Sequence, residues 1–183
     1  MDCRELGKKS GMAGETRYIV VVGNPNVGKT ALFNAMTGVH VDISNFPGTT
    51  VEMCYGRLGR DLVVDTPGVY GISSFNGAEK LVRDLVLTAD VILDVVDAAN
   101  LERDLFLTLH LIDLGLPVVV ALNMSDETAR HGLCINREAL ENILGVPVVA
   151  TAAVRREGIK TLVRALSAPR RGHQDRLLEE RLG

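Results

Sequence analysis

A glycine-rich run near the start of the chain carries the clearest chemical signal, Gly23-Asn24-Pro25-Asn26-Val27-Gly28-Lys29-Thr30. It fits the P-loop pattern G-x-x-x-x-G-K-S/T, whose backbone N–H groups bind phosphate. In that pattern Lys29 reaches the terminal phosphates of a nucleoside triphosphate, and the Thr30 hydroxyl binds Mg²⁺. The alternative is an ordinary glycine turn, which the flanking sequence disfavours. The predicted nucleotide-binding residues of this segment are Asn24, Asn26, Val27, Gly28, Lys29, Thr30 and Ala31.

The segments on either side of this run are those that a phosphate-binding loop requires. Residues 18–22 are short, apolar and mostly β-branched, which predicts a buried strand. Residues 31–36 begin a helix that is expected to end near Gly38. This order of strand, turn and helix directs the N–H groups of the turn and the positive end of the helix at one phosphate.

An acidic motif follows a second predicted strand, at residues 62–64. Asp65-Thr66-Pro67-Gly68 places a carboxylate where P-loop proteins hold Mg²⁺, commonly through water. The amide of Gly68 can sense the γ-phosphate. The alternative is an aspartate that only starts a Pro-Gly turn. The P-loop upstream favours the metal-binding role.

A polar motif after a later strand suits a guanine base. In Asn123-Met124-Ser125-Asp126, the Asp126 carboxylate can accept hydrogen bonds from the guanine N1–H and 2-amino groups, which adenine does not offer. Asn123 can tie this loop to the P-loop and touch the base. Such paired, buried hydrogen bonds discriminate strongly, because the wrong base leaves polar groups unpaired. A helix cap or a plain loop is the alternative for Ser125 and Asp126.

Three loop positions complete the set of candidates. The small-residue loop Thr151-Ala152-Ala153 suits a backbone amide that approaches guanine O6, although this signal is weak by itself. Thr49 and Thr50 lie after the first helix, where a threonine could close over Mg²⁺ and the γ-phosphate. Val69 stands where many GTPases carry a water-positioning glutamine. Hydrolysis is therefore expected to be slow, or to rely on another group, a partner or a cation.

The order of the predicted elements favours an α/β fold. Strands that alternate with helices predict a doubly wound, mainly parallel sheet of about six strands flanked by helices, the P-loop GTPase fold. Ligands of such sheets bind beyond the carboxyl ends of the strands, where the motifs fall. A loop is expected at 39–50, followed by a hairpin of 51–55 and 62–64 around Gly59. Further strands are expected at 91–96, 118–122 and 146–149, and helices around Leu81, Leu85 and Val86 and at 101–114, 137–144 and 158–166. The helix at 101–114 is expected to carry Leu101, Leu105, Leu109 and Ile112 on one face.

Length and composition limit the possible classes of protein. The 183 residues favour one domain at 17–167, preceded by a flexible leader at 1–16 and followed by a polar tail at 168–183. A net charge of −3 argues against a nucleic-acid surface. The three cysteines and four histidines lack disulfide or metal-site spacing. No apolar run is long enough to span a bilayer, so a soluble cytoplasmic chain is expected.

Taken together, the motifs resemble guanine-nucleotide-binding proteins of the translation-factor-related branch. They are most similar to the amino-terminal GTPase domain of the ferrous-iron transport protein B (FeoB) family, and the likeness covers residues 17–166. Beyond the P-loop, it rests on residues 45–52 (NFPGTTVE), 79–84 (EKLVRD), 95–103 (VVDAANLER) and 121–126 (ALNMSD).

The resemblance implies roles that the residue pattern alone leaves open. It implies that Thr50 is the switch threonine and that Asn26 ligates a K⁺ ion near the β- and γ-phosphates; a plain turn residue is the alternative for Asn26. Such an ion would supply positive charge where other enzymes use an arginine finger. Met124 is similar to this family, whereas most GTPases have lysine there. Phe46 replaces a usual tryptophan, and Ala152 replaces a usual serine, which would speed nucleotide release.

Family members are longer than this chain and continue into a helical regulatory region and a membrane channel. The resemblance therefore implies an excised switch domain that regulates ferrous iron uptake at the cytoplasmic face of the inner membrane, with a possible homo-oligomeric state. The alternative is a soluble ribosome- or tRNA-associated GTPase of the Era-like branch, which would favour lysine at Met124 and a basic appendage. An ATP-using P-loop enzyme is a third option, which Asn123 and Asp126 disfavour.

Overall fold

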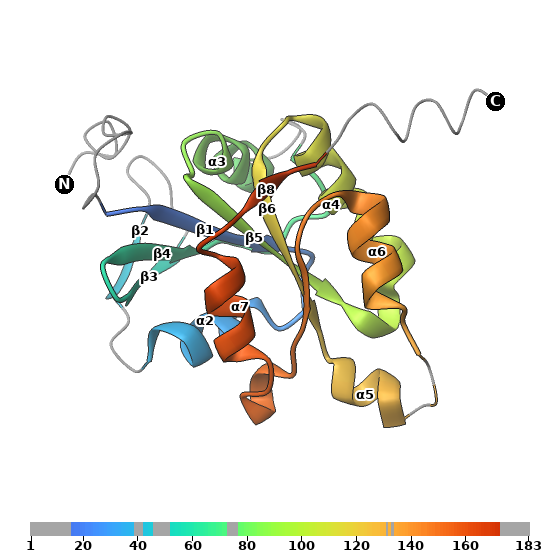
Figure 1. Cartoon of the computed structure of the whole chain (residues 1–183). Coiled ribbons are helices and arrows are strands. Elements are labelled where there is room, and N and C mark those ends of the chain that lie inside the picture. The colour runs from blue at the N-terminus through green and yellow to red at the C-terminus, as the bar shows by residue number, and fades with distance from the viewer. Residues whose placement is uncertain are drawn as a thin grey trace.

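A sheet with helices on both faces makes up the described part of the chain (Figure 1). The computed structural model describes residues 16–38, 42–45, 52–72, 77–130, 132 and 134–172. Within them the strand order is β2-β3-β4-β1-β5-β6-β7, and β8 pairs with β6. The predicted α/β class is confirmed, with eight strands rather than about six.

The elements follow the predicted alternation of strands and helices. The strands are β1 (Tyr18–Gly23), β2 (Asp42–Asn45), β3 (Glu52–Leu58), β4 (Asp61–Asp65), β5 (Val91–Asp97), β6 (Pro117–Asn123), β7 (Val148–Ala150) and β8 (Arg170–Arg171). The α-helices are α2 (Lys29–Thr37), α3 (Gly77–Val86), α4 (Leu101–Asp113), α5 (Ser125–Arg130), α6 (Arg137–Leu144) and α7 (Ile159–Ala165). Two short 3₁₀ helices are η1 (Ala98–Asn100) and η2 (Ala153–Arg155).

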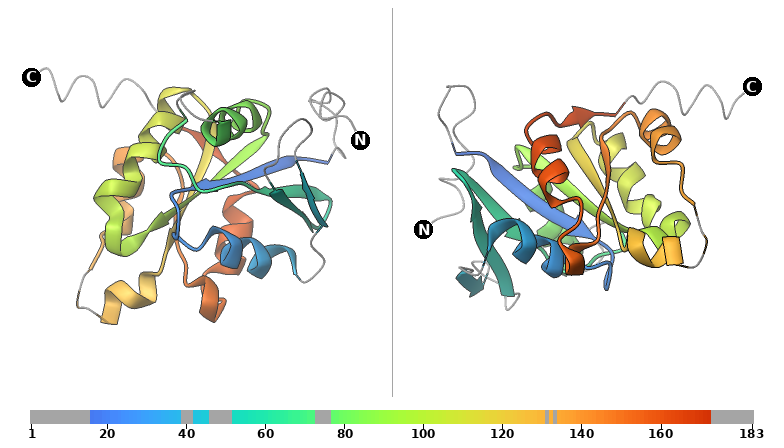
Figure 2. Two further views of the ribbon diagram at one scale, coloured as in Figure 1. Left: turned by 180° about the vertical axis from the view of Figure 1, so that it is seen from behind. Right: turned by 60° about the horizontal axis from the view of Figure 1, so that its bottom comes forward.

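The central strands are apolar because both of their faces are covered. All residues of β1 and β5 are buried, as expected for parallel strands between two helical layers. Helices α2 and α7 pack on one face, and α3, α4 and α6 pack on the other (Figures 1 and 2). Strands β4, β1, β5, β6 and β7 run parallel, so their carboxyl ends lie along one edge. The sequence motifs follow four of these five ends.

Two strands lie where the sequence predicts a loop or a tail. Residues 42–45, in the predicted loop 39–50, form β2 and pair antiparallel with β3. Arg170 and Arg171, in the predicted tail, form β8 against Pro117 and Val118. Both segments are short and mostly polar, and their pairing depends on distant partners rather than on local periodicity. The predicted hairpin is confirmed, and Gly59 at its turn has a φ of +61°.

Helix α4 packs on the core with a face that only partly matches the predicted one. Ile112 is buried as predicted, whereas Leu101, Leu105 and Leu109 are half-buried and pack at the margin of the core. An apolar pattern misses this orientation because two of the buried positions are polar. The fully buried residues are Asp104, Leu107, Thr108, Leu111 and Ile112.

Among the described residues, no helix combines the length and apolar character needed to cross a bilayer.

One acidic side chain of the central sheet is fully buried. Asp94 of β5 accepts a hydrogen bond from the Thr108 hydroxyl, at 2.5 Å from Oγ1 to Oδ2. Its other oxygen, Oδ1, has no hydrogen-bond partner among the described residues. Burial raises the pKa of Asp94 to about 7; the Thr108 hydrogen bond and Lys29 oppose this shift, and Asp104 adds to it. A buried carboxyl group with a pKa raised to about 7 thus lies within electrostatic range of Lys29 of the P-loop.

Replacing Asp94 by asparagine tests the cost of burying this charge. The pKa of Asp94 is about 7 in the folded chain and 3.8 in the reference state, so the folded state retains the proton more strongly. Its stabilising contribution is complete below the reference pKa and is lost as pH rises through 7. Between about pH 5 and pH 8, the wild type should lose roughly 1–3 kcal/mol more unfolding free energy than Asp94→Asn.

Urea denaturation without nucleotide measures this difference. The matched control is Asp84→Asn, which changes an exposed aspartate on α3 and should keep the wild-type pH dependence. Parallel pH profiles for the wild type and Asp94→Asn would show that the buried carboxyl does not titrate in this range.

Candidate nucleotide-binding site

The P-loop connects β1 to α2 at the carboxyl edge of the sheet. Asn26 and Gly28 have φ angles of +67° and +85°, in the left-handed region, so the backbone coils tightly before the helix. Gly28 is the N-cap of α2, and the helix starts at Lys29. This geometry directs successive N–H groups to the space in front of the helix, as a phosphate requires.

Gly28 is also required by a close approach between two loops. A Cβ atom on this residue would lie 2.4 Å from Asn123 Nδ2. Asn123 Nδ2 donates a hydrogen bond to the Val27 carbonyl oxygen, at 2.9 Å. The predicted connection between Asn123 and the P-loop is therefore present as a direct contact.

Lys29 is buried within the loop although it carries a charge. Its side-chain Nζ donates to the carbonyl oxygen of Asn24, at 3.1 Å. Burial lowers the pKa of Lys29, and the nearby carboxylates of Asp65, Asp94 and Asp104 oppose the shift. The ammonium group is thus held by the P-loop and by surrounding negative charge.

The Asn24 side chain is bonded to helix α4. Its Nδ2 donates to Asp104 Oδ1 at 2.5 Å, and both side chains are buried. Asp104 also accepts from the backbone N–H of Asp97, at 2.9 Å, and from Arg103 Nε, at 2.8 Å. A ligand contact by Asn24 would therefore come from its backbone. Asp104 gave no signal in the sequence, because acidic residues on helices are usually exposed.

Thr30 and Asp65 lie together, as the motifs predict. The Thr30 hydroxyl donates to Asp65 Oδ2 at 2.7 Å, while Asp65 Oδ1 is buried without a partner among the described residues. Burial raises the pKa of Asp65, and the Thr30 hydrogen bond and Lys29 oppose the shift. A carboxylate oxygen without a donor, next to a hydroxyl at the P-loop, is the kind of donor set that Mg²⁺ uses. These two residues fit the predicted metal.

The segment after β4 packs against the P-loop. A Cβ atom on Gly68 would lie 2.8 Å from Pro25 Cα, so only glycine fits without a shift. The Val69 backbone N–H donates to the carbonyl oxygen of Gly23 at 3.2 Å, and its side chain is buried in the core. Val69 therefore cannot present a polar group to a water molecule.

Asn123 joins three segments through a single side chain. In addition to its bond to Val27, its Oδ1 accepts from the Thr151 hydroxyl at 3.2 Å and from the Ala153 N–H at 3.1 Å. Ser125 strengthens the link, because its N–H and its hydroxyl both donate to the Thr151 carbonyl oxygen. The loop after β6, the loop after β7 and the P-loop are thus fixed relative to one another.

Asp126 lies in the first turn of α5. The residue that is predicted to bind the base is therefore also part of a helix start, the alternative that the sequence allows for it. Met124, which precedes the helix, has a φ of +58°. The Asp126 carboxylate accepts hydrogen bonds from Arg130 Nη2 at 2.8 Å and forms an ion pair with Arg155 Nε at 3.3 Å. No local pattern indicates Arg155, because its ion pair with Asp126 joins two segments that lie far apart in the sequence.

The loop at residues 151–153 uses its N–H groups within the protein. Thr151 N–H donates to Leu122, Ala152 N–H to Glu157 and Ala153 N–H to Asn123. The contact from this loop to guanine O6 remains a prediction. An N–H group that binds O6 would have to share its hydrogen with its present acceptor in the protein or give up that acceptor. Thr49, Thr50 and Phe46 lie outside the described residues.

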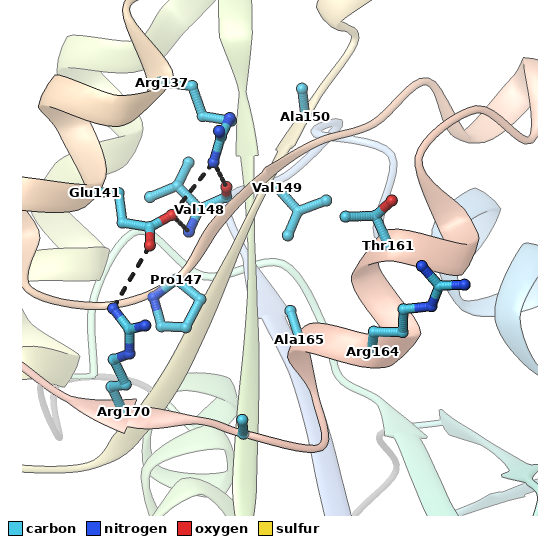
Figure 3. A pocket seen from close by; sticks show the side chains of 11 residues that line it. Arg137, Glu141, Pro147, Val148, Val149, Ala150, Thr161, Arg164, Ala165 and Arg170 are labelled. Carbon is cyan, nitrogen blue, oxygen red and sulfur yellow. Dashed lines mark hydrogen bonds and ion pairs between the residues drawn. The ribbon is translucent and has the colours of Figure 1, made fainter.

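A cavity of about 580 Å³ lies elsewhere, between α6 and α7 beside β7 (Figure 3). Glu141 forms ion pairs there with Arg137 at 3.3 Å and with Arg170 at 3.5 Å. The edge of β7 that faces away from β6 is capped by side chains at Val148. The Val148 N–H donates to Glu141 Oε2, and the Val148 carbonyl oxygen accepts from Arg137. This cavity contains none of the motif residues, so the chemistry at the P-loop, rather than the concave shape, locates the nucleotide site.

Comparison with known proteins identifies the family. The family described as ferrous iron transport protein B matches residues 17–166. The chain belongs to this family. The Fe(2+) transporter FeoB of Legionella pneumophila is 42% identical over 161 residues, which cover 81% of this chain and 21% of that protein. A Porphyromonas gingivalis fusion of Fe(2+) transport protein A with FeoB is 40% identical and covers 81% of this chain and 18% of the fusion. The chain thus spans about a fifth of the length of these relatives.

Solved FeoB structures share the fold. An S. thermophilus NFeoB mutant bound to mGDP has a TM-score of 0.82 at 43% identity, covering 85% of this chain and 62% of that chain. The FeoB G-domain of Methanococcus jannaschii has a TM-score of 0.71 at 36% identity, covering 84% of this chain and 96% of that domain. The predicted P-loop GTPase fold is therefore confirmed.

The contacts predict different consequences for replacing Asn123 and for replacing Asp126, two polar residues of the motif at the end of β6. Asn123→Ala removes the bonds to Val27, Thr151 and Ala153 and leaves buried groups unpaired, so it should lower the unfolding free energy by about 2–4 kcal/mol without nucleotide. Asp126→Ala, which removes only contacts to exposed arginines, should change it by less than about 1 kcal/mol. Urea denaturation of the nucleotide-free variants measures both values, and equal losses would contradict the assignment.

Proposed function

We propose that this chain binds GTP with Mg²⁺ and slowly hydrolyses it to GDP and phosphate. The observation that carries this proposal is the direct bond from Asn123 to the P-loop, which places the candidate base site beside the phosphate site. Structures of related FeoB domains support it, since one contains GMPPNP and another contains GDP and AlF₄⁻.

The phosphate half of the proposed site depends on charge and backbone donors. The buried ammonium group of Lys29 would lie beside the β- and γ-phosphates, and the N–H groups of the P-loop would surround them. Thr30 and Asp65 would hold Mg²⁺, which supplies charge stabilisation at the phosphates when bound. The Gly68 N–H and Thr50 would respond to the γ-phosphate.

The base half of the proposed site depends on Asp126. A carboxylate accepts from the guanine N1–H and 2-amino groups, and adenine lacks this pair of donors. Asn123 and Met124 would lie beside the base, with the loop of Thr151, Ala152 and Ala153 on its O6 side. The proposed preference for GTP over ATP rests on these contacts.

Hydrolysis would proceed without a glutamine at position 69. The exposed Asn26 is in the left-handed region, so its side chain lies on the outside of the P-loop rather than in the core. It could hold K⁺ near the β- and γ-phosphates, where a cation stabilises the charge that develops during phosphoryl transfer. The chain's own contribution would then be to position phosphates and cations.

In the longer protein, this domain would regulate Fe²⁺ uptake. Relatives named as Fe(2+) transporters contain the matching segment as about a fifth of their length. A switch domain of this type would lie at the cytoplasmic face of the inner membrane and act on the transport domain, through a helical regulatory region. The ribosome-associated alternative finds less support, because Met124 replaces the expected lysine and the net charge is −3.

The K⁺ proposal predicts a cation-dependent turnover. Without an activator the wild type should hydrolyse GTP at on the order of 10⁻³ s⁻¹, and at least about tenfold faster in K⁺ than in Na⁺. Asn26→Ala should remove this difference. Phosphate release in matched chloride salts measures the rates, and Asn34→Ala, an exposed asparagine on α2, is the control. Identical wild-type rates in the two salts would exclude the role of Asn26.

The base assignment predicts a loss of guanine affinity in Asp126→Asn. The amide replaces one acceptor with a donor, so GDP and GTP binding should weaken by on the order of 100-fold or more. Titration calorimetry checks this result, with Glu127→Gln on the same helix as the control. Normal GTP affinity in Asp126→Asn, or tighter binding of ATP than GTP by the wild type, would show that the assignment is wrong.

A further inference from the structure

The Asp126 carboxylate is held by arginines from two different segments. Arg130 belongs to α5, the same helix as Asp126, and its Nη2 lies 2.8 Å from Oδ2. Arg155 belongs to η2, in the loop after β7, and its Nε lies 3.3 Å from the same oxygen. The side chain of Asp126 is 16% exposed and that of Arg155 is 54% exposed, so the pair lies at the rim of the site.

The backbone that carries Arg155 is firmly attached to the site. Its own η2 turn begins with Ala153, whose N–H is bonded to Asn123. Ala152 and Glu157 form an antiparallel bridge that closes the loop, and Arg156 completes the turn with a φ of +57°. The loop therefore presents the Arg155 side chain from a fixed position next to Asp126.

The contacts leave part of the carboxylate free for a ligand. Within the described residues, every hydrogen bond and ion pair of Asp126 ends on Oδ2. A carboxylate has about four lone-pair sites, so two arginine donors leave capacity for two further donors. Guanine offers two donors on this edge, the N1–H and the 2-amino group. The arginine contacts and the base can thus be accommodated together.

We propose that Arg155 is a positioning residue, which orients Asp126 toward the guanine edge and slows the release of GDP. This inference rests on the proposed binding of guanine nucleotides. Arg130 moves with the helix of Asp126, whereas Arg155 links that carboxylate to the loop after β7. Arg155 therefore couples the two loops that would surround the base. The neighbouring Ala152 has no side-chain donor to perform this role.

The test compares Arg155→Ala with Arg155→Lys and Arg156→Ala. Arg156 is exposed in the same turn, and no contact between its side chain and Asp126 is present, so its removal changes charge without removing the ion pair. Fluorescent GDP, displaced by excess GDP, gives the release rate. Competition with IDP, which lacks the 2-amino group, gives the base discrimination. Thermal unfolding without nucleotide controls for loss of folding.

Arg155→Ala should release GDP about two- to fivefold faster, as expected for one half-exposed charged contact. It should also reduce the preference for GDP over IDP, because a less ordered carboxylate recognises the 2-amino group less well. Arg155→Lys should fall between it and the wild type, and Arg156→Ala should match the wild type.

Two results would overturn the inference while the wild type still binds GDP. One is an unchanged ratio of GDP to IDP affinity in Arg155→Ala, and the other is slower GDP release in that variant. The second result would mean that the arginine competes with the base. Absence of GDP binding by the wild type would instead contradict the proposed function itself.

Discussion

The Asn123 side-chain amide is the contact on which the arrangement of the site depends. Its nitrogen bonds the P-loop, and its oxygen accepts from the loop after β7. All of these groups are buried, so each would be costly to leave unpaired. Asn123 can come this close to the P-loop only because residue 28 is a glycine without a Cβ atom. Gly28 of the phosphate site and Asn123 of the base site therefore constrain each other directly.

A second group of buried polar residues supports the P-loop from below. Asp104 bonds the Asn24 side chain and the backbone of Asp97, and so connects α4 to both the P-loop and the end of β5. The negative charges of Asp65, Asp94 and Asp104 oppose the lowering of the Lys29 pKa by burial. Bonds within the protein thus hold the P-loop in this structure, and such preorganisation reduces the ordering required on phosphate binding.

Local sequence was sufficient for those parts of the fold that depend on local patterns. The P-loop, the apolar central strands and helix α6 with its terminal Gly145 lie where periodicity and glycine placement predict them. The strand at 42–45 and the burial of Asp104 and Thr108 on α4 could not be predicted in this way, because these residues are mostly polar. Likewise, motif spacing located Asn123 and Asp65, but the pairing of Asp126 with Arg155 depends on how two loops meet in space.

The covered edge of β7 limits how copies of this domain can associate. An open strand edge is a template on which another chain can add a strand. At Val148, however, Glu141 and Arg137 already occupy the outward N–H and C=O groups. The sheet therefore cannot be extended at this end unless the two side chains leave. At this end of the sheet, copies of the domain would have to associate through helices or loops rather than through added strands.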